Sequence, residues 1–260
     1  MRSHFHSHVW QTIFLGDRLF LAPIGDHPQK VLDLGTGAGI WAIDFADTFP
    51  SARVTGIDIS PIQPCWVPPN CKFQVDDIEQ PWGWSDDYFD YIHVRNLEGC
   101  IADWPRLYEQ AFRHLRPGGW FEIKEFDIES QSQAHDARGE PLDENHIFKR
   151  WARVIFGALE RLGKPGTQSR DHGIAEALGA AGFVDVVEHR WPIPIGTWPR
   201  EPKMKEVGAF NHHYLDESLE GFSVYLLKEV LGWEYTEIVA FVEEMRLALK
   251  DRRLAPYLNL

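Results

Sequence analysis

The segment from Val31 to Gly39 constrains the fold of this chain most strongly, because an apolar run leads directly into closely spaced glycines. Glycine adopts backbone conformations that other residues avoid, and it lets the main chain approach a ligand closely. A dinucleotide-binding turn would place its third glycine where this chain has Ile40, and a P-loop would need a Lys-Ser/Thr pair that is absent here. The remaining GxGxG spacing, with Asp33 just ahead of it, predicts a nucleotide-binding turn between a strand and a helix.

The first half of the chain alternates short apolar runs with helix-length segments. This alternation is typical of an α/β fold with a doubly wound, mostly parallel sheet. We expect the first helix to end at Pro50, and a turn with Pro117 and Gly118 to precede the fifth strand. The expected strands are Lys30–Leu34, Arg53–Ile57, Lys72–Val75, Tyr91–Val94 and Trp120–Lys124, and the expected helices are Ile40–Phe49 and Trp104–Leu115.

Helical segments dominate the second half. We expect a single domain over residues 1–260, with an N-terminal helical segment (1–29), a cofactor-binding core (30–142), and a helical cover that includes a sixth strand (143–260). Asp143 or Asn145 is expected to cap the helix that follows. The expected elements here are helices at Ile147–Leu162, Ile174–Ala181, Lys203–Asn211, Leu219–Leu231 and Tyr235–Lys250, and a strand near Val184–Glu188.

Charge and cysteine content narrow the classes of function. The formal net charge of −13 opposes direct nucleic-acid binding, because phosphates are neutralised by clustered Lys and Arg, and the longest basic grouping runs only from Lys250 to Arg253. The sequence contains no apolar run of transmembrane length, no signal peptide and no cysteine pairing pattern. We therefore expect a small-molecule substrate, no membrane association, and a cytoplasmic location with the nucleus as the alternative.

Candidate ligand-binding residues follow the predicted strands, because open parallel sheets bind ligands at their carboxyl edge. Asp58 ends the second strand, where a carboxylate is placed to accept hydrogen bonds from both ribose hydroxyls. After the third strand, either Asp76 or Asp77 is expected to accept a hydrogen bond from adenine, while a neighbouring backbone N–H donates to the ring. The expected cofactor-binding residues are Asp33, Gly35, Thr36, Gly37, Asp58, Ile59, Asp76, Asp77, Ile78, Arg95 and Asn96.

Two histidines and a glutamate are weaker candidates for catalysis. His212 and His213 belong to the segment expected to cover the pocket, where either imidazole could act as a general base or simply cap a helix. Glu125 follows the fifth strand and is the second candidate for a base. Carboxylates at strand ends are also often solvated or paired with Arg, so both interpretations stay open.

Alternating histidines near the N-terminus could bind a metal if their segment were a strand. His4, His6 and His8 would then share one strand face. The same segment is equally compatible with a helix, and no carboxylate partner is evident. We therefore predict no metal site.

Several consecutive motifs together resemble one family. They are Asp33–Ala42, Gly56–Pro64, Val67–Asn70, Leu115–Trp120, Pro194–Pro199, Leu219–Ser223 and Leu231–Trp233. These motifs are similar to the fungal LaeA-like methyltransferases, and the likeness spans nearly the whole chain. The resemblance implies a class I methyltransferase fold that binds S-adenosyl-L-methionine (SAM) at Gly35, Gly37, Asp58 and Asp76 or Asp77. It does not identify the methyl acceptor.

The resemblance implies a methyltransferase of secondary metabolism that acts on an oxygen, nitrogen or carbon atom of a small molecule. The mechanism would be in-line displacement, to which the protein contributes orientation and no nucleophile. Two other functions stay open: a regulatory or scaffold protein that acts through a partner, and an enzyme that binds SAM but catalyses a cyclisation.

The chain departs from the family at both ends. Relatives usually carry an acidic, aromatic segment upstream of the position of Arg2. They also usually carry a final strand beyond the position of Tyr257, inserted antiparallel between the fifth and sixth strands. Their absence here predicts an incomplete lid and an unpaired sheet edge, which proteins normally cover. We expect a partner in a homo- or hetero-oligomer, or an altered sheet order, to cover that edge.

Overall fold

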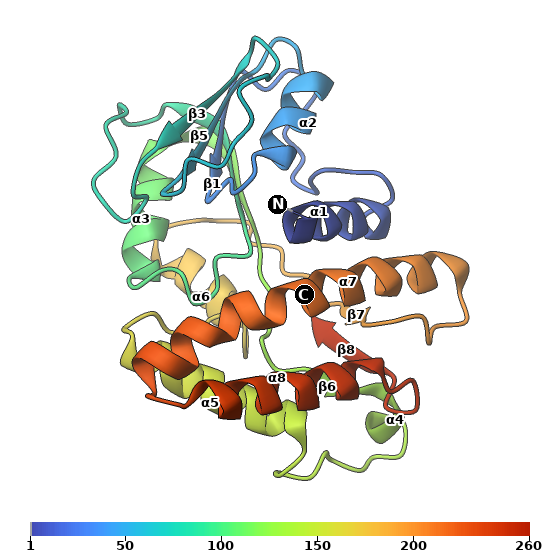
Figure 1. Ribbon diagram of the computed structural model, residues 1–260. Coiled ribbons are helices and arrows are strands. Elements are labelled where there is room, and N and C mark those ends of the chain that lie inside the picture. Colours follow the sequence, from blue (N-terminus) through green and yellow to red (C-terminus); the bar gives the residue numbers. More distant parts are fainter. Residues whose placement is uncertain (1) are drawn as a thin grey trace.

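A parallel sheet of five strands lies at the centre of the computed structural model, which describes residues 2–260. The strand order is β3-β2-β1-β4-β5, and all four pairings are parallel, which confirms the predicted fold class (Figure 1). The strands are β1 (Lys30–Leu34), β2 (Arg53–Asp58), β3 (Cys71–Val75), β4 (Phe89–Arg95) and β5 (Leu115–Lys124).

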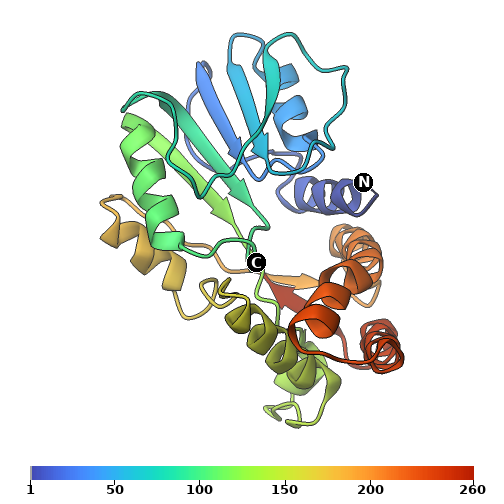
Figure 2. The same cartoon turned by 60° about the vertical axis from the view of Figure 1, so that its left-hand side comes forward.

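Helices cover both faces of this sheet, as a parallel sheet with buried strands requires. On one face, Trp41 and Phe45 of α2 pack on Val31 and Val54. On the other face, α3 and α6 pack on the sheet through residues that include Leu107 (Figure 2). The helices are α2 (Ile40–Thr48), α3 (Trp104–His114) and α6 (Gly173–Ala180).

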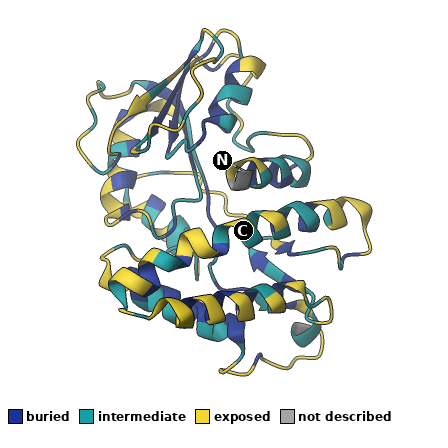
Figure 3. Ribbon diagram, viewed as in Figure 1, coloured by how far each residue is buried: buried dark blue, intermediate teal, exposed yellow. Residues whose placement is uncertain are grey.

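A second core lies beside the sheet and is formed by helices around a small antiparallel sheet of order β6-β8-β7. Trp151 of α5 stacks on Phe241 of α8, with ring centroids 5.2 Å apart. Figure 3 shows the buried residues gathered inside both cores, while the outer faces of α7 and α8 are exposed. The elements are β6 (Gln131–Ser132), α4 (Gln133–Asp136), α5 (Ile147–Arg161), β7 (Pro192–Pro194), α7 (Pro202–Tyr225), the π-helical segment η1 (Leu226–Val230), α8 (Tyr235–Lys250) and β8 (Pro256–Asn259).

The final strand belongs to this second sheet and not to the central one. β8 pairs with β6 and β7, and β5 is an edge strand of the central sheet, so among the described strands none covers that edge and the expected altered sheet order is wrong. A partner that covers this edge stays a prediction. The sixth strand predicted near Val184–Glu188 is wrong. Asp185 has a φ of +54°, which interrupts an extended conformation, and the segment forms a loop instead.

Two helix boundaries also differ from the sequence prediction. α5 begins at Ile147, and its N-cap is His146, whose side chain accepts a hydrogen bond from Phe148 N (3.2 Å). The prediction that Asp143 or Asn145 caps this helix is therefore wrong. The two helices predicted at 203–211 and 219–231 form one continuous helix, because no breaker separates them. Asn211 is buried within it and donates to Pro194 O.

The N-terminal helix α1 (Arg2–Phe14) lies between α2 and α7 (Figures 1 and 2). Its side chains contact the glycine-rich turn on one side and α7 on the other, as described below. No helix in the described part of the chain is long and apolar enough to cross a membrane.

Candidate functional site

The turn after β1 is a backbone cradle that only glycine can form. Gly35, Gly37 and Gly39 have φ values of +66°, +56° and +78°. A Cβ atom at Gly35 would lie 2.4 Å from a methyl carbon of Leu97, and one at Gly39 would lie 2.3 Å from the Phe73 ring. The turn then leads into α2, so that its backbone faces the carboxyl edge of the sheet.

Asp58, the last residue of β2, connects this turn to the next loop. Its Oδ2 accepts a hydrogen bond from Gly37 N (2.8 Å), and its Oδ1 accepts one from Ser60 N (2.9 Å). Each carboxylate oxygen can accept a further hydrogen bond, so the residue can still receive a pair of hydroxyl donors. Ile59 is 72% exposed beside it and offers an apolar surface for a flat ring.

Asp33 lies beneath the turn. It is 3% exposed, and its two oxygens contact Thr36 Oγ1 (2.6 Å) and His93 Nδ1 (2.7 Å). Burial raises the pKa of Asp33 to about 6 and holds the pKa of His93 well below its usual value. The His93 ring stacks on Trp41 at a centroid distance of 3.8 Å. Asp33 and Thr36 therefore support the turn from below, and a ligand cannot reach the Asp33 carboxylate directly.

The three predicted cofactor-binding residues after β3, Asp76, Asp77 and Ile78, lie in different environments. The two Asp77 oxygens accept hydrogen bonds from Glu79 N and Gln80 Nε2, so this carboxylate stabilises its own turn and its pKa is lowered. Asp76 is exposed and lies next to Asp58, because its backbone N–H donates a hydrogen bond to Asp58 O (3.1 Å). Ile78 packs into the core, which leaves only its backbone for a ligand.

Arg95 and Asn96, at the end of β4, connect the sheet to α1. Asn96 Nδ2 donates a hydrogen bond to Ser7 Oγ (3.1 Å), and Arg95 Nη1 lies 3.4 Å from His8 Nδ1. Burial lowers the pKa of the Arg95 guanidinium, while Asp33 acts in the opposite direction. The two residues thus hold the N-terminal helix at the carboxyl edge of the sheet.

Helix α1 contributes side chains that the sequence prediction did not assign to the site. A Cβ atom at Gly37 would lie 3.0 Å from the His4 ring, and His8 Nε2 lies 2.8 Å from Asp44 Oδ2. The sequence signal was the i, i+4 spacing of these two histidines, which places both on one face of a helix. His6 points instead toward α7. Within the described residues, no cluster of His, Cys, Asp or Glu side chains could hold a metal ion.

Glu125 follows β5 and anchors the turn after β4. Its Oε1 accepts from Leu97 N (2.8 Å) and its Oε2 from Glu98 N (2.9 Å), and burial raises its pKa to about 8. Tyr214 reaches this region from α7, where burial and the Glu125 carboxylate raise its pKa to about 12. Tyr214 is a second side chain that the sequence prediction did not assign to the site.

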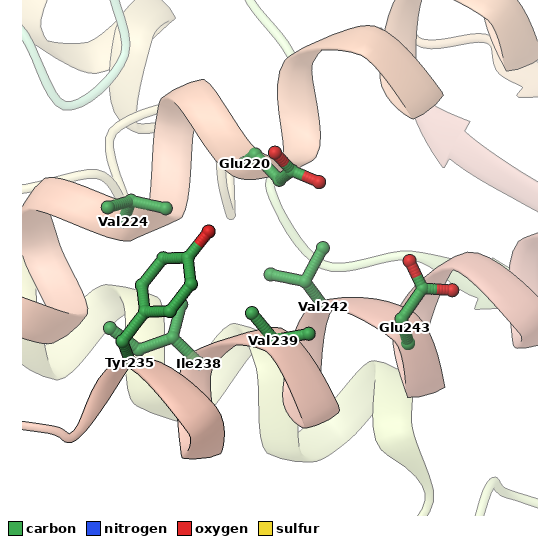
Figure 4. A pocket seen from close by; sticks show the side chains of 7 residues that line it. All are labelled: Glu220, Val224, Tyr235, Ile238, Val239, Val242 and Glu243. Atoms are coloured by element: carbon green, nitrogen blue, oxygen red, sulfur yellow. The ribbon is translucent and has the colours of Figure 1, made fainter.

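The structure places His212 and His213 apart from the glycine-rich turn. Both line a hollow of about 200 Å³ beneath α7, together with Trp198 and Lys250. Helix α1 lies between α7 and the turn, and its His6 ring is 5.6 Å from that of His213. A second groove, between α7 and α8, has a volume of about 20 Å³ and is lined by Val239 and Tyr235 (Figure 4), so an organic ligand would not fit in it.

The cradle and Asp58 fit an adenosyl cofactor. The turn combines three glycines of positive φ at the carboxyl end of β1, and the Asp58 carboxylate lies at the end of the adjacent strand. The domain model that matches residues 7–187 is described as a methyltransferase domain. The chain therefore belongs to the SAM-dependent methyltransferases, and its cofactor is SAM.

Among curated proteins, the chain is similar to fungal members of this family. It is 40% identical over 232 residues to methyltransferase pytC of Aspergillus terreus, which covers 89% of this chain and 69% of pytC. It is 35% identical to the secondary metabolism regulator LAE1 of Cochliobolus heterostrophus, over 97% of this chain and 82% of that protein. It is 31% identical to the protein-methionine methyltransferase laeA of Emericella nidulans, over 94% of this chain and 63% of laeA. The predicted LaeA-like family is thereby confirmed.

Solved structures confirm the fold. The cyclopropane synthase MmaA2 from Mycobacterium tuberculosis superposes with a TM-score of 0.54 at 16% identity, over 90% of this chain and 78% of that one. Phosphoethanolamine N-methyltransferase 2 from Haemonchus contortus, solved with SAM, gives a TM-score of 0.53 at 18% identity, over 96% of this chain but only 50% of that one.

Proposed function

We propose that the chain transfers the methyl group of SAM to a small-molecule acceptor of fungal secondary metabolism. The observation that carries this proposal is the connection of Asp58 to Gly37 N, which couples the carboxylate for the ribose to the backbone cradle. When bound, SAM supplies an electrophilic methyl group on a sulfonium. The similarity to pytC, which is named a methyltransferase, at 40% identity supports methyl transfer as the activity.

The residues around the carboxyl edge of β4 and β5 suit orientation of an acceptor better than activation of a nucleophile. Glu125 is 5% exposed and burial raises its pKa to about 8, so its carboxyl group is mostly protonated at neutral pH, which weakens its predicted role as a base. His212 lies on the far side of α1. We infer that Tyr214, whose ring lies 6.3 Å from that of Phe126 just after β5, donates its phenolic hydrogen to the acceptor and helps to position it.

A methyl-transfer assay tests the proposal. The chain is incubated with SAM labelled in its methyl group and a fungal metabolite extract, and label and S-adenosylhomocysteine are measured together. We expect label in the small-molecule fraction, and less of it with Asp58→Asn at a limiting concentration of SAM. Label recovered only in protein would contradict a small-molecule acceptor, and S-adenosylhomocysteine absent under all conditions would favour the scaffold function or the cyclisation.

Regulation of secondary metabolism is a second candidate function. The relatives named as regulators are 31–35% identical to this chain over at least 94% of its length. Methylation of a protein acceptor, including the chain itself, would then appear as label in the protein fraction of the same assay.

A further inference from the structure

The hollow beneath α7 carries a local charge opposite to that of the whole molecule. Lys250 and Arg252 carry its positive charge, and no Asp or Glu is among its lining residues in the described part of the chain. His212 and His213 also line it, and burial lowers the pKa of His212. The full chain has 39 acidic against 26 basic residues, so a basic hollow is not explained by composition. Such a cluster attracts an anionic group.

The two cationic side chains are held at the hollow by contacts that leave donors free. Arg252 donates through one guanidinium nitrogen to Thr197 O (3.2 Å), and the guanidinium carries five N–H donors in all. Lys250 Nζ lies 3.8 Å from Asp216 Oδ1, but the same carboxylate is closer to Arg246, at 2.8 Å. A ligand anion can therefore bind both cations without displacing a strong ion pair.

The rest of the hollow is apolar and preformed. The Trp198 indole N–H donates to Pro256 O (2.9 Å), which fixes the ring, and Ile195 and Leu249 are buried beside it. The volume of about 200 Å³ is below that of sites for drug-sized ligands. A ligand with a planar aromatic ring and an acidic group fits this lining, because the ring can pack against Trp198 while the acidic group binds Arg252.

We propose that this hollow is a binding site for a small aromatic carboxylate, separate from the methyl-donor site. Helix α1 lies between the hollow and the glycine-rich turn. The proposal is therefore independent of methyl transfer, and a chain that fails to bind SAM can still bind the carboxylate.

Calorimetric titration with 2-naphthoate tests the proposal, and the uncharged isostere 2-naphthamide shows whether the negative charge matters. Because a hydrogen bond to a charged group is stronger than one to a neutral group, we expect the acid to bind at least about tenfold more tightly than the amide. Equal affinity for the two ligands, or no heat with the acid at millimolar concentration, would overturn the proposal.

A pair of neighbouring arginines provides matched variants. Arg252→Gln is expected to weaken 2-naphthoate binding by about tenfold, whereas Arg253→Gln should change it little, since Arg253 is 91% exposed, pairs with Asp251 and does not line the hollow. Arg252→Lys keeps the charge and should restore part of the affinity. Circular dichroism verifies that each variant is folded.

The location of the bound carboxylate can be followed by NMR. We expect 2-naphthoate to shift the ring signals of His212 and His213 more than that of His172, which is exposed and pairs with Glu188. Binding without a shift at His212 and His213, or an Arg252→Gln affinity equal to that of the original chain, would place the ligand elsewhere and exclude this site.

Discussion

Gly39 illustrates how a single residue fixes the cofactor turn. It has a φ of +78° at the start of α2, and a Cβ there would lie 2.3 Å from the Phe73 ring. Gly39→Ala should lower the free energy of unfolding by about 2 kcal/mol, from left-handed strain and overpacking. Gly179→Ala, in α6 with no neighbour within 4 Å of the added Cβ, should raise it by roughly 0.5 kcal/mol. Urea denaturation measures both, and equal effects would contradict the steric account.

We expect Glu98 to make the free energy of unfolding depend on pH. Its carboxyl is 8% exposed, and burial raises its pKa from 4.5 to about 7. As the pH rises, the unfolded chain releases this proton first, so the contribution of Glu98 to the free energy of unfolding falls between pH 4.5 and 7 and stays constant above.

Glu98→Gln removes this titration. Relative to the original chain, we expect the variant to gain about 3 kcal/mol between pH 4.5 and 8, since one pKa unit corresponds to about 1.4 kcal/mol. Glu140→Gln, at an exposed glutamate paired with Arg138, is the control and should show no such change. Parallel stability curves for Glu98→Gln and the original chain would show that Glu98 titrates normally.

At the scale of elements, α1 joins the two halves of the molecule. Trp10 is fully buried and packs against Phe126, with ring centroids 5.4 Å apart. Trp10→Ala should therefore lower the free energy of unfolding by about 3–5 kcal/mol, through loss of burial and the cavity left behind. Trp66→Ala is the matched control, because Trp66 is 94% exposed and should contribute little. Thermal denaturation compares the two, and a similar loss for both would argue against docking of α1 through Trp10.

The elements that the sequence predicted well are those with local signals. β1 and β4 are apolar runs of strand length, and Gly37 and Asp58 follow from spacing alone, so the central sheet and the cradle were predictable. The second core depends on contacts between distant segments, such as Asn211 with Pro194 and β8 with β6. Local periodicity does not encode such pairings. The false strand near residue 186 has a local cause, since Asp185 has a φ of +54°, and the single helix α7 follows from the lack of a breaker between residues 211 and 219.

The same reason explains the incomplete prediction of the site. His4 reaches the sheet edge because α1 docks between α2 and α7, and Tyr214 reaches it from α7. His212 and His213 were predicted as bases from their chemistry and their place in the covering segment. Helical geometry turns His212 toward the hollow with Trp198, whereas Tyr214 faces the sheet.

The whole molecule combines a sheet that holds the cofactor with a helical half that covers its carboxyl edge. Calorimetric titration with SAM and S-adenosylhomocysteine tests this account most directly. We expect both ligands to bind to the original chain. The control variant Asp47→Asn, at an exposed aspartate of α2, should bind them equally well. Asp58→Asn should bind them at least about tenfold more weakly, because it loses hydrogen bonds to a charged group. Undetectable binding to the original chain at millimolar concentration, or equal affinity in Asp58→Asn, would contradict it.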